Sequence, residues 1–150
     1  MATTSVRAPD ASSPPTVGED GWAASLAGIE RAHYLSLTTF RRGGAPVMTP
    51  VWFARVGQAL YVITDDDTGK VKRIKNDPAV RVAPSTARGE PIGDTVPARA
   101  RVLPVTEASP GMRALSAKYR WLFTAFALMH RLQRKTPVLL EIVGQATLRE

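Results

Sequence analysis

The sequence predicts a mainly β protein, built as an antiparallel sandwich or barrel with a few flanking helices. Six short segments are rich in β-branched and aromatic residues, and turn residues separate several of them. Short strands at this spacing favour an antiparallel sheet over a βαβ fold. The chain has 150 residues, of which 44% are apolar, and this suits a single domain with one core.

The six strands are bounded by glycine-containing turns in the first half of the chain. Arg41–Gly44 marks one such turn, and Gly57-Gln58 marks the next. We expect strands at residues 34–40, 47–53, 59–64, 80–85, 96–105 and 138–143.

Three helices are expected around these strands. Trp22, Leu26 and Ile29 recur at helical spacing, and a short helix over 68–76 has Thr68 as its N-cap and a stop at Asn76-Asp77-Pro78. A longer helix is expected from residue 110 to about 135, and its basic face indicates a packing or dimer helix, with an acidic ligand or a membrane surface as alternatives. Its apolar stripe consists of Leu115, Tyr119, Leu122, Phe126 and Met129.

Composition limits the possible functions. Residues 1–20 are poor in large apolar residues and are expected to form a flexible tail before a domain at 21–150. We expect a cytoplasmic protein, because the N-terminus lacks the apolar segment of a secretory signal and no apolar run is long enough to span a bilayer. The chain has no cysteine, which excludes disulfides, thiolate nucleophiles and metal sites built on sulfur.

The chain is strongly basic, with a formal net charge of +7. The first 25 residues contain one arginine and three acidic residues, so the remainder carries a net charge of +9. A body this basic suits an anionic partner, which could be nucleic acid, a phosphorylated small molecule or an acidic membrane. We find no recognised nucleic-acid motif, and we do not expect nucleic acid as a partner.

The most informative segment is Thr64–Ile74, where a predicted strand ends and a short helix begins. The start of a helix offers unpaired N–H groups and the positive end of its dipole, which together suit a phosphate. Thr68, Lys70 and Arg73 would stand near that end, although a solvated basic helix is an equally good interpretation from spacing alone. Asp65-Asp66-Asp67 is interpreted as a solvated acidic loop, and we expect no metal site.

Proline inside two predicted strands is the second informative feature. Pro50 and Pro84 each remove a ladder hydrogen bond, so they belong at sheet edges or bulges, where they could also serve only to block aggregation. An edge of this kind lets a flat ligand approach the backbone, and Trp52 supplies a rigid aromatic ring beside it.

In this order, the features resemble the split β-barrel proteins of the pyridoxamine-phosphate-oxidase-like family. The resemblance covers about residues 25–145, and within the family the chain is most similar to the actinobacterial branch of F420-dependent enzymes. Its most specific parts are TPVWF at 49–53, the T-x-x-x-T-G-K-V-K-R-I segment that begins at Thr64, and R-V-A-P followed by R-G-x-P-x-G.

The resemblance implies a six-stranded antiparallel split barrel of the FMN-binding type, with a C-terminal helix and two cofactor clefts at the interface of a homodimer. Lys70 matches the lysine that holds the cofactor phosphate, and Thr68 matches the hydroxyl residue two positions before it. Flavin-binding members often carry Arg before that lysine, where this chain has Gly69; this weighs against FMN unless Lys72 or Arg73 substitutes. The expected cofactor-binding residues are Met48, Thr49, Pro50, Val51, Trp52, Thr64, Thr68, Gly69, Lys70, Arg73, Ser85 and Thr86.

The function implied by the resemblance is hydride transfer between reduced coenzyme F420 and an unsaturated organic acceptor, a small molecule. The alternatives are an FMN-dependent oxidase or reductase and a non-catalytic module that binds a phosphorylated or tetrapyrrole ligand. No catalytic residue can be assigned, and Tyr61, Ser85, Thr86 or water are the candidates for a proton donor.

Overall fold

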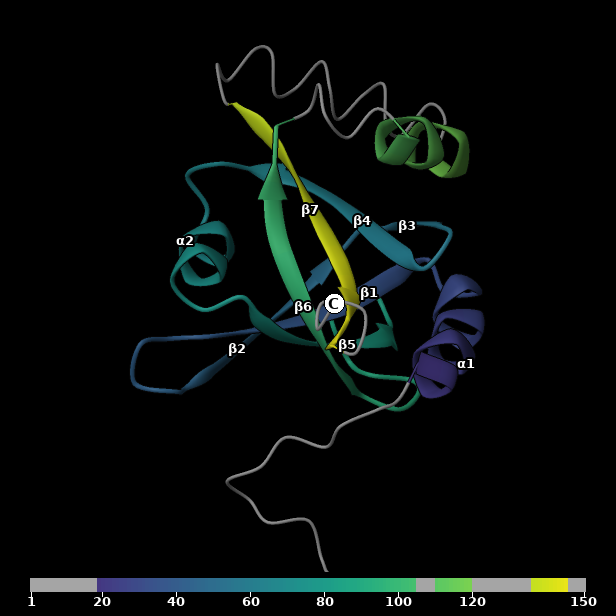
Figure 1. Cartoon of the computed structure of the whole chain (residues 1–150), viewed down its shortest axis with the longest axis horizontal. Coiled ribbons are helices and arrows are strands. Elements are labelled where there is room, and N and C mark those ends of the chain that lie inside the picture. Colours follow the sequence, from purple (N-terminus) through teal and green to yellow (C-terminus); the bar gives the residue numbers. More distant parts are fainter. Residues whose placement is uncertain (1–18, 105–109, 120–135, 146–150) are drawn as a thin grey trace, which may run out of the picture.

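The computed structural model describes residues 19–104, 110–119 and 136–145. Within these ranges the strands form one seven-stranded antiparallel sheet in the order β2-β1-β5-β6-β7-β4-β3 (Figure 1). The strands are β1 (Tyr34–Phe40), β2 (Pro46–Val51), β3 (Ala54–Val56), β4 (Ala59–Asp65), β5 (Ala79–Ser85), β6 (Val96–Leu103) and β7 (Pro137–Gly144). The labelled helices are α1 (Glu19–Glu30) and α2 (Gly69–Asn76), and residues 110–119 are also helical.

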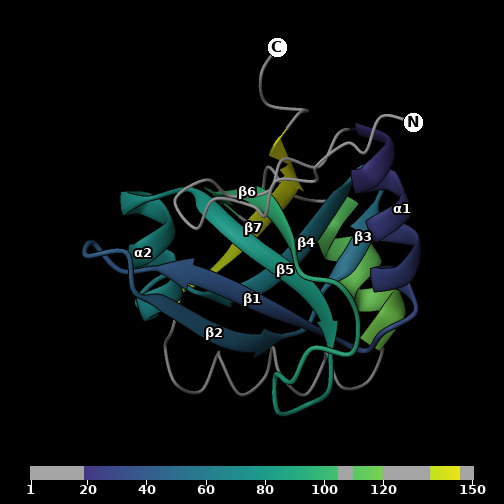
Figure 2. The same cartoon turned by 90° about the horizontal axis from the view of Figure 1, so that it is seen from below.

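The sheet is rolled up because its two edge strands are consecutive in the chain. β2 lies at one edge and β3 at the other, and only Trp52 and Phe53 separate them. Three residue steps reach at most about 11 Å, so the two edges must lie close together. Figures 1 and 2 show the resulting barrel, with α1 and α2 at opposite ends of it.

All six predicted strands are confirmed, with ends that differ by at most two residues. β3 was not predicted, because three residues are too few to show an alternating pattern. The prediction extended β2 to Phe53, whereas β2 ends at Val51, where the chain leaves β1 and begins to pair with β4. The helix expected over 110–135 is confirmed for 110–119, and its remainder, with Leu122, Phe126 and Met129, lies outside the described residues, as does the predicted tail up to residue 18.

Both labelled helices close the barrel with apolar side chains. Trp22, Leu26 and Ile29 of α1 are buried in the same core cluster as Val71 and Ile74 of α2. The Trp22 indole N–H also donates a hydrogen bond of 2.8 Å to the carbonyl oxygen of Gln58. Burying several large side chains of this kind is the main favourable term for a domain of this size.

The junction between the two edge strands is held by the helix over residues 110–119. The Tyr119 hydroxyl accepts a hydrogen bond of 3.0 Å from the Phe53 N–H, and its single O–H proton is shared between the carbonyl oxygens of His33, 2.8 Å away, and Phe53, 3.0 Å away. Burial raises the pKa of Tyr119 to about 12, which keeps this hydroxyl neutral. The ammonium nitrogen of Lys118 lies 3.4 Å from the Phe53 ring centroid, where a cation–π contact is favourable.

We predict that Tyr119→Phe lowers the free energy of unfolding by about 1–3 kcal/mol, because the buried N–H of Phe53 loses its acceptor. Tyr61→Phe is the matched control, since the Tyr61 hydroxyl donates to Glu141, and Glu141 keeps its ion pair with Arg101. Urea unfolding of both variants measures the difference. Equal losses in the two variants would contradict a special role for the Phe53 junction.

Candidate functional site

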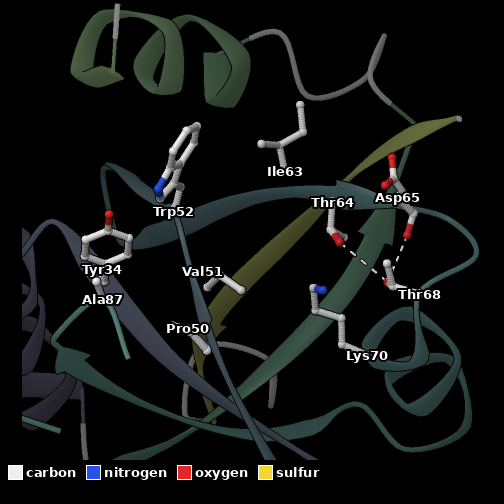
Figure 3. A pocket seen from close by; sticks show the side chains of 10 residues that line it. All are labelled: Tyr34, Pro50, Val51, Trp52, Ile63, Thr64, Asp65, Thr68, Lys70 and Ala87. Carbon is white, nitrogen blue, oxygen red and sulfur yellow. Dashed lines mark hydrogen bonds between the residues drawn. The ribbon is translucent and has the colours of Figure 1, made fainter. Parts of the chain in front are cut away.

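A cavity of about 330 Å³ lies where the end of β2 approaches the end of β4 and the start of α2 (Figure 3). Its walls come from β1, β2, β4, α2 and the loop after β5, so distant parts of the sequence meet here. The lining residues are Tyr34, Pro50, Val51, Trp52, Ile63, Thr64, Asp65, Thr68, Lys70 and Ala87.

The apolar wall follows from strand alternation. Pro50 and Trp52 are two residues apart and project to the same side of the chain, and Ser36 of β1 stands opposite Pro50. Tyr34 lies two residues before Ser36 and therefore shares that side. The loop after β5 packs against this wall at Gly89, whose φ is +88° and where an added Cβ would lie 3.2 Å from the Pro50 Cδ. Glycine suits this position for both reasons.

Polar groups gather at the opposite end of the cavity. Thr64, Asp65 and Thr68 lie together there, and the Lys70 ammonium points between them and Val51 (Figure 3). The rotation of α2 sets this direction, because Val71 and Ile74 are buried in the barrel core. Because Val71 points into the core, its neighbour Lys70 lies on an adjacent side of the helix and faces the cavity.

Lys70 is a partly buried cation without a partner among the residues that the structure describes: no hydrogen bond or ion pair joins it to any of them. Burial lowers the pKa of Lys70, and repulsion from Arg73 lowers it further, while Asp65 acts in the opposite direction. A charge held in this way is costly to the protein alone and is relieved by an anion.

The start of α2 adds donors to the same end. Thr68 occupies the N-cap position, as predicted, but its hydroxyl does not cap the helix. It donates instead to the Asp65 carbonyl oxygen at 2.9 Å and lies 3.5 Å from the Thr64 hydroxyl. No acidic side chain stands in the first turn of α2. The first N–H groups of the helix are therefore left for an external acceptor.

Half of the twelve expected site residues line the cavity. Met48 lies on the same face of β2 as Pro50 but beyond the cavity, with 52% of its surface exposed, and Thr49 belongs to the opposite face of that strand. Ser85 is buried and donates to the Thr86 carbonyl oxygen, while the Thr86 hydroxyl accepts from the Glu90 N–H. Six line it: Pro50, Val51, Trp52, Thr64, Thr68 and Lys70.

Arg73 and Gly69 lie beside the cavity and do not line it. The Arg73 side chain turns back over the helix start, so a Cβ on Gly69 would lie 2.7 Å from an Arg73 guanidinium nitrogen. Its Nε donates a hydrogen bond of 2.6 Å to the Thr39 hydroxyl. Arg73 instead lines a smaller hollow on the other side of α2, together with Phe40, Arg42, Lys72 and Asn76.

Sequence reasoning missed Tyr34 and Ala87 as lining residues. It also interpreted Asp65 as part of a solvated loop, and this is wrong for Asp65, which is only 8% exposed because β4 extends through it and pairs with Pro137. Asp66 and Asp67 are exposed as expected. The signal that could have indicated Asp65 was its place directly after the alternating strand.

No cluster of three or more His, Asp or Glu residues that could hold a metal ion occurs in the described parts of the chain. Among the helices of the described residues, none has the length and apolar character needed to cross a bilayer.

Comparison with known proteins identifies the family. Residues 22–143 match the family described as pyridoxamine 5'-phosphate oxidase, which is most of the chain. This chain belongs to that family. The resemblance to this family is therefore confirmed, and the barrel described above is the split barrel of the family. None of the curated protein sequences compared with the chain matches it.

Several solved structures share this fold. An F420 reductase aligns with a TM-score of 0.54 and 19% identity, over 81% of this chain and 93% of its own. An FAD-binding protein from Mesorhizobium loti aligns with a TM-score of 0.56 and 16% identity, over 82% and 87%. General stress protein 26 from Bacillus anthracis aligns with a TM-score of 0.51 and 21% identity, over 81% and 86%. At these identities the likeness concerns the fold alone.

We predict that Lys70→Met leaves the free energy of unfolding unchanged or raises it by up to about 1 kcal/mol. The lowered pKa of Lys70 means that its charge is disfavoured in the folded protein, so an uncharged side chain of similar length should fit at least as well. Chemical unfolding near pH 7 measures this. A loss above about 1 kcal/mol would show that Lys70 serves the fold and is not held in place for a ligand.

Proposed function

We propose that this protein is an F420-dependent oxidoreductase that transfers a hydride between the reduced deazaflavin and an unsaturated organic acceptor. The observation that carries the proposal is the Lys70 ammonium, which lines the cavity and has no hydrogen-bond or ion-pair partner among the described residues. Family membership supports a ring cofactor with a phosphate-bearing arm, and one protein of the same fold is an F420 reductase.

The lining residues fit such a cofactor. Pro50, Val51 and Ile63 offer an apolar surface for a planar ring, and Lys70 with the first N–H groups of α2 would hold the phosphate. When bound, the deazaflavin supplies the hydride chemistry. The chain's own part is to anchor the anionic arm, orient the ring against β2 and exclude water from the apolar wall.

FMN is the alternative cofactor, and the FAD-binding protein of the same fold keeps a flavin under consideration. Gly69 weighs against FMN, because flavin-binding members often carry an arginine at this position. Arg73 does not replace that arginine, since it turns toward Thr39 and does not reach the cavity. The basic body, with a net charge of +9 after residue 25, favours the longer and more acidic arm of F420. A binder without activity would take up cofactor but would never oxidise its reduced form.

We also propose a cytoplasmic homodimer with the cavity at the subunit interface, as the family resemblance implies. The apolar outer face of β2 supports this, since Met48 is half exposed beside the cavity on the same face as Pro50 and Trp52. Sedimentation equilibrium should give twice the chain mass, and a monomer at micromolar concentration would contradict the dimer.

Lys70→Ala should weaken F420 binding by about 1.5–3 kcal/mol, the scale of a charge-assisted hydrogen bond, which is roughly 10- to 150-fold in Kd. Lys75→Ala is the matched control, because it removes the same charge from the exposed last turn of α2. Quenching of tryptophan fluorescence during titration measures both, since Trp52 lines the cavity. Equal effects of the two substitutions would place the phosphate elsewhere.

Binding should also depend on the protonation of Lys70. The pKa of Lys70 is lowered in the free protein, and a bound phosphate favours the charged form, so affinity is highest at low pH and falls as pH rises through that lowered pKa. Lys70→Arg should remove this fall up to pH 10.5, because arginine stays protonated. Titrations between pH 7 and 10.5 test it, and the same pH profile in wild type and Lys70→Arg would contradict the assignment.

A further inference from the structure

A second hollow, of about 170 Å³, lies on the other side of α2 from the cavity, and the proposed function does not use it. Its walls come from the end of β1, the turn between β1 and β2, and α2. Figures 1 and 2 show this turn beside α2, so two segments that are separate in the sequence bring their side chains to one place. The lining residues are Phe40, Arg42, Lys72, Arg73 and Asn76.

Cations predominate around this hollow. Arg42 and Lys72 are exposed, whereas Arg73 is partly buried and its Nε donates a hydrogen bond of 2.6 Å to the Thr39 hydroxyl. Arg41 brings a further positive charge from the turn. Burial lowers the pKa of Arg73, and repulsion from Arg41 lowers it further. Four positive side chains therefore act on the same small region.

No ion pair balances these charges in the part of the chain that the structure describes. The ion pairs found there join β3 to α1 and β6 to β7, and neither includes a cation of the turn or of α2. No acidic group opposes the lowering of the Arg73 pKa. Like charges gathered in this way repel one another, and an anion bound among them relieves the repulsion.

The size and the lining of the hollow indicate a small ligand with more than one negative charge. Its volume is about half that of the cavity, 170 against 330 Å³. Arg42 lines it from the turn and Lys72 from α2, so an anion with two charged ends can contact both. Arginine binds phosphate oxygens through paired N–H donors, and lysine adds a point charge. The Arg81 guanidinium carbon, 5.8 Å from the Phe40 ring centroid, adds positive charge beside the apolar wall.

We propose that this hollow is a second binding site, which takes a diphosphate group. The site is independent of the proposed function, since none of its lining residues lines the cavity. Two phosphoryl groups carry several negative charges at neutral pH, which suits cations that approach from two sides. Inorganic diphosphate and a nucleoside diphosphate both present this group.

Titration of the Lys70→Ala variant with inorganic pyrophosphate tests the proposal by calorimetry, because this variant lacks the cation of the cavity. Pyrophosphate should still bind. Adding Arg42→Ala or Lys72→Ala should weaken that binding by on the order of 10- to 100-fold. Both side chains are exposed, so the thermal midpoint of the free protein should stay unchanged.

Arg31→Ala, added to the same variant, is the matched control. It removes the same charge as Arg42→Ala from an exposed position directly after α1, at the opposite end of the barrel. The pyrophosphate Kd should stay within about twofold, because salt screens a charge at that distance. Titration with ADP separates the two sources of the group: an equal Kd indicates inorganic diphosphate, and tighter binding of ADP indicates a nucleotide.

Three results would overturn the inference. The first is a Lys70→Ala variant that binds no pyrophosphate, and the second is an equal loss of affinity with Arg31→Ala and Arg42→Ala. The third is wild-type protein in which saturating F420 abolishes all pyrophosphate binding, since the hollow would then belong to the cofactor site. Failure of wild-type protein to bind F420 would refute the proposed function alone and leave the diphosphate titrations as the test of the hollow.

Discussion

The two-residue link between the edge strands of the sheet is the constraint on which the rest of the structure depends. Trp52 and Phe53 connect β2 to β3, which lie at opposite edges, so the sheet can exist only when it is rolled up. In the closed barrel the two linking residues point to different places. The Phe53 side chain enters the core, whereas Trp52 faces the cavity and stacks on Tyr119 with ring centroids 5.0 Å apart. The same closure brings the end of β2 toward the end of β4, and the cavity lies between them.

A second constraint sets the direction of the Lys70 side chain. Val71 and Ile74 must enter the barrel core, and this fixes the rotation of α2 so that Lys70 faces the cavity while Arg73 turns toward Thr39. The protein thus keeps the Lys70 charge partly buried, although this charge makes no hydrogen bond or ion pair with the described residues. Sites of this kind are common where a protein sacrifices some stability for a ligand.

The sequence predicts the strands well because alternation is a local signal, and it locates Thr68 and Lys70 because a strand followed by a short helix is also local. It cannot predict which side chains meet across the barrel. Tyr34 reaches the cavity through the pairing of β1 with β2 and β5, and the burial of Asp65 follows from the length of β4. Thr68 illustrates the same limit, since its hydroxyl prefers the Asp65 carbonyl oxygen to the helix start.

A solved complex with F420 tests the central claim most directly. The account predicts the phosphate of the cofactor within hydrogen-bond distance of the Lys70 Nζ and the first N–H groups of α2, with the ring against Pro50 and Val51. The cofactor's phosphate bound in the hollow formed by Arg42 and Lys72 on the other side of α2, or a ring outside the cavity, would contradict it.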